Sequence, residues 1–125
     1  MGDGVWLVRP KIVAMYSIQT LRVYNAAEWF AVDVARVVKV RKLRPNDSSQ
    51  LLRSSGAISD LIAEGYGRGA GADRKRVYRQ ARGEVLESMN QLKKLLRRGL
   101  LSERVFYPLF NRGLAIVNML DRLID

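Results

Sequence analysis

Lysine and arginine are the residues through which this sequence could do chemistry. Its 125 residues carry 22 Lys and Arg against 12 Asp and Glu, which gives a formal net charge of +10. Ten of these cations fall between positions 68 and 98, where the only acids are Asp73, Glu84 and Glu87. A positive field of this kind attracts nucleic acid, anionic membrane or acidic protein, and the composition alone does not choose among them.

Part of this cationic segment has helical spacing. Lys75, Arg79 and Arg82 are four and three residues apart, which puts them on one face of a helix. Helical steps continue that face to Lys93 and Arg97. A one-sided row of cations on a rigid helix can follow phosphates, because neutralising them releases counterions. We therefore predict contacts with RNA or DNA at Arg68, Arg74, Lys75, Arg79, Arg82, Lys93 and Arg97.

Two other readings of the same charges stay open. The cationic face could simply be solvated and keep a small protein soluble, or it could bind a protein partner, which would make the chain an adaptor. A second basic cluster has no acid within it and comprises Arg36, Lys39, Arg41, Lys42 and Arg44.

Catalysis is disfavoured by the residue types that are absent. The sequence has no His and no Cys, which excludes serine–histidine, cysteine–histidine and zinc-water chemistry. Carboxylates alone can bind magnesium, but Asp60, Glu64, Glu84 and Glu87 lack metal-ligand spacing. A structural ion pair, such as Glu64 with Arg53 or Arg68, is the favoured interpretation. We predict a non-enzymatic protein with no catalytic residue, no metal and no cofactor.

A glycine-rich segment separates two of the predicted elements, with Gly at positions 65, 67, 69 and 71. With Arg68 it could cradle a phosphate at a helix N-terminus. The dinucleotide-binding fingerprint requires a preceding strand, however, and the preceding residues have helical periodicity. A helix C-cap at Gly65 followed by a flexible connection is therefore the favoured interpretation.

The elements that must position these residues are helices. Apolar residues recur at three- and four-residue steps in four segments, separated by breaks at Pro45, Gly65 and Gly99. This pattern predicts an all-α, antiparallel four-helix bundle over residues 17–125, with helices at about 18–43, 47–64, 72–98 and 102–124.

Residues 1–16 do not follow the helical pattern and are predicted to be an N-terminal extension, either a loose arm or short strands. No apolar run approaches the roughly 18 residues needed to cross a bilayer. We therefore predict a cytoplasmic protein without a membrane partner.

Three residues are candidates for contacts between subunits. Trp29 and Tyr66 lie outside the apolar stripes of their helices, and protein interfaces are enriched in Trp and Tyr. Glu64 could pair with a neighbouring subunit. We predict Trp29, Glu64 and Tyr66 as contacts in a homo-oligomer.

The residues Ile-Ala-Glu-Gly-Tyr-Gly-Arg at positions 62–68 resemble a motif of a known family. It comprises the small four-helix-bundle proteins encoded by intervening sequences in bacterial large-subunit rRNA genes. Similar segments occur at 21–24, 49–53, 82–87 and 91–92. The chain departs from the family pattern at two places. Shortly before the motif it has Ser59 and Leu61, where the family usually has Pro and Asn. After the third-helix glycine it has Glu84, where the family usually has Ser.

The resemblance implies an antiparallel bundle that assembles into a ring of five protomers, a homopentamer without known catalytic activity. The chain is more distantly similar to the accessory variability determinant of diversity-generating retroelements. That protein is a basic pentameric bundle that binds a reverse transcriptase and nucleic acid. The resemblance therefore implies nucleic acid, or a reverse transcriptase or other polymerase, as partner.

Overall fold

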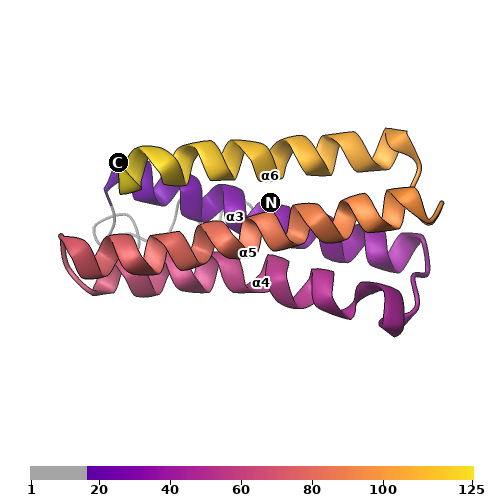
Figure 1. Cartoon of the computed structure of the whole chain (residues 1–125), viewed down its shortest axis with the longest axis horizontal. Coiled ribbons are helices and arrows are strands. Elements are labelled where there is room, and N and C mark those ends of the chain that lie inside the picture. The colour runs from indigo at the N-terminus through magenta and orange to yellow at the C-terminus, as the bar shows by residue number, and fades with distance from the viewer. Residues whose placement is uncertain (1–16) are drawn as a thin grey trace, which may run out of the picture.

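The chain folds into four long α-helices. A computed structural model describes residues 17–125, and the predicted N-terminal extension, residues 1–16, lies outside the described residues. The helices are α3 (Ile18–Val40), α4 (Pro45–Gly67), α5 (Ala72–Arg97) and α6 (Glu103–Ile124). Each packs against the next along the chain, and α3 packs against α6, which closes the antiparallel bundle (Figure 1). The all-α four-helix bundle is confirmed.

The boundary between the first two helices differs from the predicted one for local reasons. Helix α3 ends at Val40 rather than near residue 43, and Lys42 adopts a left-handed conformation with φ 54°. Helix α4 begins at Pro45, two residues earlier than expected. Proline suits a first helical position because it lacks the amide hydrogen that would be left unbonded there. At the other end of α3, the Thr20 amide donates to Ser17 Oγ at 3.1 Å.

The predicted C-cap at Gly65 is wrong. Helix α4 continues to Gly67, and Gly65 is buried inside it against α5. A Cβ atom at position 65 would lie 2.7 Å from Tyr78 Cδ1, so glycine is required by close packing and not by a left-handed turn. Two glycines of this connection have a positive φ, Gly69 at 78° and Gly71 at 120°.

Apolar side chains from all four helices, aliphatic and aromatic, fill the core. Burial of each large one contributes roughly 1.5–3 kcal/mol, and the largest fully buried side chains include Phe30, Ile58, Ile62, Leu92 and Leu120. Helix α5 turns its predicted apolar stripe inward. The charged side of α5 consequently faces solvent.

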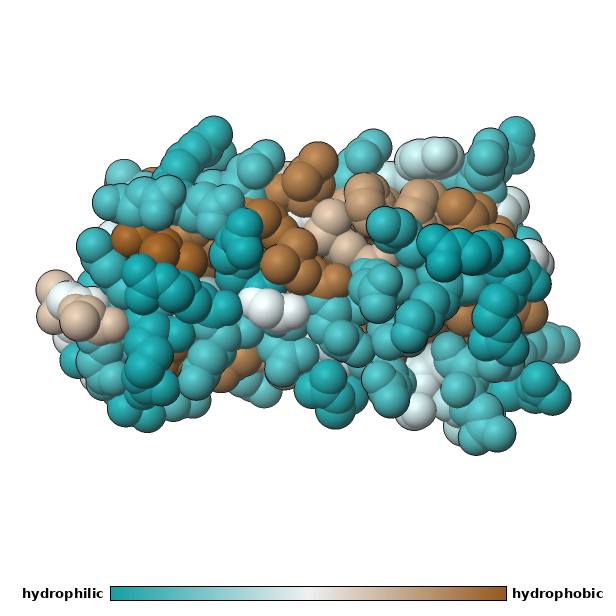
Figure 2. Space-filling model, viewed as in Figure 1, coloured by the Kyte–Doolittle hydropathy of each residue, from teal (hydrophilic) through white to brown (hydrophobic). Residues whose placement is uncertain are grey.

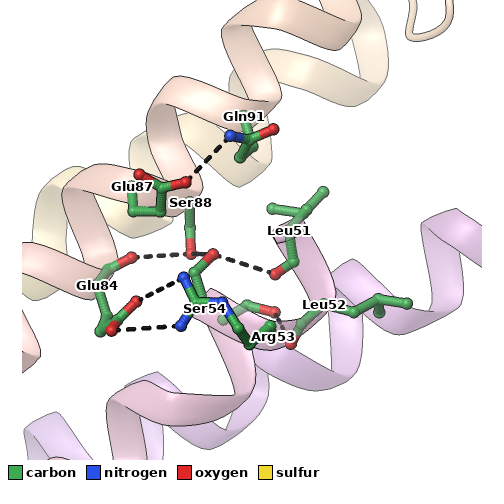
Figure 3. A network of polar contacts seen from close by, with 9 residues as sticks. Leu51, Leu52, Arg53, Ser54, Glu84, Glu87, Ser88 and Gln91 are labelled. Carbon is green, nitrogen blue, oxygen red and sulfur yellow. Dashed lines mark hydrogen bonds and ion pairs between the residues drawn. The ribbon is translucent and has the colours of Figure 1, made fainter. Parts of the chain in front are cut away.

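Small polar residues line the contact between α4 and α5. Ser54 and Ser88 are fully buried, and their hydroxyl oxygens are 2.7 Å apart (Figure 3). One of the two hydroxyls donates to the other, which in turn donates to a carbonyl of its own helix. Ser88 Oγ lies 3.0 Å from the Glu84 carbonyl oxygen and Ser54 Oγ lies 3.3 Å from the Leu51 carbonyl oxygen. At the rim of this layer Arg53 pairs with Glu84 at 3.4 Å. These short side chains let the two helix backbones approach closely while every buried hydroxyl in the layer is bonded.

Candidate nucleic-acid interface

Helix α5 presents one row of cations to solvent. Its other side is buried through Val77, Tyr78, Ala81, Val85 and Leu92. On the solvent-facing side of the helix, Arg79, Lys93 and Arg97 are exposed, and Lys75 is half-buried. Within residues 17–125, no carboxylate lies in salt-bridge range of these four side chains. Four of the seven predicted contacts are therefore free to meet an external anion.

Two other predicted contacts are held by carboxylates of the same chain. Arg82 Nε donates to Asp121 Oδ1 at 2.7 Å, which ties α5 to α6. Arg68 donates to Glu64 Oε2 at 2.7 Å and to Asp73 Oδ2 at 3.1 Å. Glu64 therefore forms the intrachain ion pair with Arg68 that its position suggested.

Asp73 joins this network at the start of α5. It also accepts hydrogen bonds from Arg76, the shorter at 2.9 Å. The Arg76 and Arg68 guanidiniums lower the pKa of Asp73 below its ordinary value of 3.8. Its charged form therefore stabilises the fold above that pH, and the contribution is lost as the pH falls through the lowered pKa. The glycine-rich segment is thus bridged by ion pairs, and Arg68 is already occupied by two carboxylates.

The seventh predicted contact, Arg74, packs against its own chain. Its guanidinium lies 4.2 Å from the centre of the Tyr66 ring. Its Nη2 donates to the Tyr66 carbonyl at 2.8 Å. Stacking on an aromatic face and bonding to a helix-end carbonyl make Arg74 a structural residue of the α4–α5 connection.

The bundle brings together cations from two segments that are distant in the sequence. The α3–α4 connection and the α5–α6 connection lie at the same end of the molecule and together line a hollow of about 500 Å³. We call this the basic end and define it as residues 37–48 and 93–104. It contains nine Lys and Arg, with Asp47 and Glu103 as its acids. Because consecutive helices are antiparallel, the sequence could have predicted that both clusters share one end.

One carboxylate organises the basic end. Asp47 pairs with Arg98 at 2.9 Å and with Arg44 at 3.4 Å. The hydrogen bond from Arg98 is the main reason that the pKa of Asp47 lies below 3.8. In the described part of the chain, no salt bridge engages the remaining cations of this end, which are Lys39, Arg41, Lys42, Lys93, Lys94, Arg97 and Arg104.

The opposite end of the bundle has a different charge balance. We call it the mixed-charge end and define it, among the described residues, as 17–24, 60–79 and 118–125. It holds seven Lys and Arg together with five Asp and Glu. The Arg68, Arg76 and Arg82 pairs described above all involve acids of this end. Within this end, Arg68 and Arg76 are thereby neutralised locally.

Comparison with known proteins places this geometry in a family. The model of the 23S rRNA-intervening sequence protein family matches residues 19–122. The chain belongs to this family. It is also similar to a crystal structure of a protein of unknown function from the S23 ribosomal protein family of Bacteroides thetaiotaomicron VPI-5482. The two are 25% identical, the match covers 86% of this chain and 98% of that chain, and the TM-score is 0.75. No curated protein matches the chain.

The three predicted subunit contacts of this 23S rRNA-intervening sequence protein lie in different surroundings. Glu64 and Tyr66 are engaged within the chain by Arg68 and Arg74. Trp29 is 44% exposed and lines a hollow of about 470 Å³ between α3 and α6. The bundle thus brings Glu64 and Tyr66 together at the mixed-charge end, and it leaves Trp29 on a separate face.

Neither a metal site nor a membrane span is found in the part of the chain that the structure describes. Among residues 17–125 there is no group of three or more carboxylates placed to hold a metal ion. None of the described helices is long and apolar enough to span a membrane.

Proposed function

We propose that this chain is a non-enzymatic, oligomeric protein that binds nucleic acid through phosphate contacts without sequence preference. The observation that carries the proposal is the row Lys75, Arg79, Lys93 and Arg97, whose charges meet no carboxylate of the described chain. Unpaired cations on one side of a rigid helix gain by neutralising phosphates, because each contact releases condensed counterions.

The dimensions of α5 suit a backbone-tracking contact. At a rise of about 1.5 Å per residue, the row from Lys75 to Arg97 extends over about 33 Å of helix. Several phosphates of one strand fit within that length. The row carries no planar aromatic group for stacking on bases, which favours electrostatic over sequence-specific binding.

The test is a salt titration of binding. Fluorescence anisotropy with labelled single-stranded RNA, single-stranded DNA and duplex DNA should give affinities that fall steeply as salt rises. Charge reversal in Arg79→Glu/Lys93→Glu/Arg97→Glu should remove most of the binding. An affinity that does not respond to salt, or that survives the triple substitution, would contradict the proposal.

Oligomerisation through α3 is the second part of the proposal. Ile18, Trp29, Val32 and Val40 are all exposed apolar residues of α3, by 76%, 44%, 43% and 68% respectively. Helical spacing puts them on the outward side of α3, away from its buried stripe. A second copy of the chain is the occupant we propose, in a ring whose subunit number the family resemblance suggests to be five. Light scattering should give a multiple of 14.2 kDa, and Trp29→Glu/Val32→Glu should give the monomer.

One observation favours a protein partner as the alternative ligand of the same side. Helices α5 and α6 expose Leu86, Leu114 and Tyr107, by 43%, 45% and 51%. Figure 2 shows hydrophobic surface along the seam between these helices, bordered by hydrophilic side chains. Exposed apolar side chains do not bind phosphates, whereas they can pack against apolar residues of a polymerase or another protein. If this alternative holds, Leu86→Ser/Leu114→Ser should abolish capture of a polymerase in nuclease-treated extracts and leave nucleic-acid affinity unchanged.

A further inference from the structure

We propose that the nucleic acid makes its main contacts at the basic end of the bundle, where the row on α5 ends, and that the footprint continues from there onto the α3–α4 connection. This inference rests on the proposed function and specifies where on the surface it takes place. The footprint would combine Arg41 and Lys42 of the α3–α4 connection with Lys94 and Arg97 of α5. These residues are more than 50 positions apart in the sequence and meet only because the helices are antiparallel.

The basic end has the larger local excess of positive charge. Nine cations share the basic end with two acids, whereas the mixed-charge end has seven cations and five acids. Lys75 and Arg79 lie near the mixed-charge end, where Asp73 and Asp121 oppose the field of their neighbours. Lys93 and Arg97 lie at the basic end, where two acids face nine cations. The attraction for a polyanion is therefore greatest at the basic end.

The surface of the basic end is concave. The hollow of about 500 Å³ is lined by Arg41, Lys42 and Arg44, with Gly99 and Leu100 on its other side. A neighbouring hollow of about 260 Å³ is lined by Asn46, Gln91, Lys94, Arg97 and Arg98, among others. Asp47 borders both hollows, and its charge is already neutralised by Arg44 and Arg98. Two adjacent concave sites with net positive linings suit successive phosphates of one strand.

Lys42 has an unusual backbone conformation for its residue type. It is the one non-glycine residue with a positive φ among residues 17–125, and its φ is 54°. This left-handed conformation belongs to the C-cap of α3, where the Leu43 amide donates to the Val38 carbonyl at 3.0 Å. Glycine is the usual residue at such a position because it adopts the conformation without strain. Lysine there supplies an ammonium without a carboxylate partner on the wall of the larger hollow.

Helix ends do not account for the charge. Two helices begin at the basic end and two terminate there, so their opposite partial charges largely cancel. The attraction therefore comes from the lysine and arginine side chains, which makes it removable by substitution.

The experiment compares two double substitutions with equal change of charge. Lys42→Glu/Lys94→Glu alters the basic end, and Arg22→Glu/Arg122→Glu, at two exposed arginines outside the row on α5, is the matched control at the mixed-charge end. Anisotropy with a labelled 20-nucleotide single-stranded RNA and a 20-base-pair DNA would be measured from about 50 to 300 mM salt. We expect Lys42→Glu/Lys94→Glu to weaken binding at least tenfold and to flatten the salt dependence. The control should weaken it less than threefold.

Each outcome has a defined meaning. Equal losses in the two variants, or a larger loss in the control, would overturn the basic end as the footprint while the proposed function survives. A wild-type protein without salt-dependent binding would overturn the proposed function itself. The neutralising pair Lys42→Gly/Lys94→Ala, checked by circular dichroism, tests the same footprint without introducing acids and should also weaken binding by several-fold.

Discussion

The two ends of this bundle use the same kinds of residue for different purposes. At the mixed-charge end, two arginines stabilise the fold itself. Arg68 bridges the α4–α5 connection through Glu64 and Asp73, and the Arg74 guanidinium stacks on the Tyr66 ring. At the basic end, Asp47 engages two arginines and the other cations have no carboxylate partner in the described structure. Uncompensated like charges oppose folding. Their presence at one end indicates a role outside the fold.

The largest expected effect comes from the close packing at the mixed-charge end. Gly65→Ala would place a Cβ atom 2.7 Å from the Tyr78 ring, which is 1% exposed and cannot withdraw. We expect a net loss of about 1–2 kcal/mol in the free energy of unfolding, measured by urea denaturation. Gly67→Ala is the control, because nothing lies within 4 Å of its Cβ position. Equal effects of the two changes would contradict the close packing.

The next effect concerns the hydroxyl of Tyr78 itself. Tyr78 Oη and Thr20 Oγ1 are hydrogen-bonded at 3.3 Å, so Tyr78→Phe should cost about 1 kcal/mol. Burial raises the pKa of Tyr78 above its ordinary value of 10.0. The stability it contributes is complete below pH 10 and is lost as the pH rises through the raised pKa. Denaturation curves from pH 7 to 11 should therefore fall less steeply for Tyr78→Phe, and parallel curves would contradict this.

At the basic end a substitution should stabilise the protein. Lys42→Gly relieves the left-handed strain at φ 54° and removes one unpaired charge. We expect a gain of up to about 1 kcal/mol in urea denaturation. Lys39→Gly, inside helix α3, should instead lose about 1 kcal/mol. If both lose stability, the strain at Lys42 does not exist. The gain would come with weaker nucleic-acid binding, which is the signature of a residue retained for function.

The smallest effect separates paired from unpaired arginines on α5. Arg82→Ala breaks the pair with Asp121, in which both side chains are 39% exposed, and should cost about 0.2–1 kcal/mol. Arg79→Ala removes a cation without a partner and should change stability by less than about 0.5 kcal/mol. The difference should shrink in 1 M salt, since screening acts on the ion pair. A salt-independent difference would point to packing in place of charge.

The sequence predicted the bundle because its apolar spacing is regular in all four helices, and each stripe needs a partner. It could not predict that Gly65 is a contact residue, because that depends on the register between α4 and α5. The same holds for Ser54 and Ser88, which meet across 34 positions. The contact between these two hydroxyls could not be predicted from the spacing of apolar residues, because serines are not part of that pattern.

The candidate site was predicted in part for a related reason. Helical spacing identified the row that contains Arg79, Lys93 and Arg97. It could not reveal that Asp121, 39 positions away, neutralises Arg82. Helical spacing also gave no sign that residues 36–44 and 93–98 lie close together, although the antiparallel topology brings them to one end of the bundle. Local pattern predicts which face a side chain occupies, and the partners on that face come from distant elements.

The unequal ends have a consequence for the moments before contact. A rod with its positive charge concentrated at one tip experiences a torque in the field of a long polyanion. It would turn that tip forward while still separated by a Debye length of about 10 Å at 0.1 M salt. Encounters would then begin in nearly the bound orientation, which raises the association rate and makes that rate fall with ionic strength. The uneven charge distribution would thus steer the association as well as stabilise the complex.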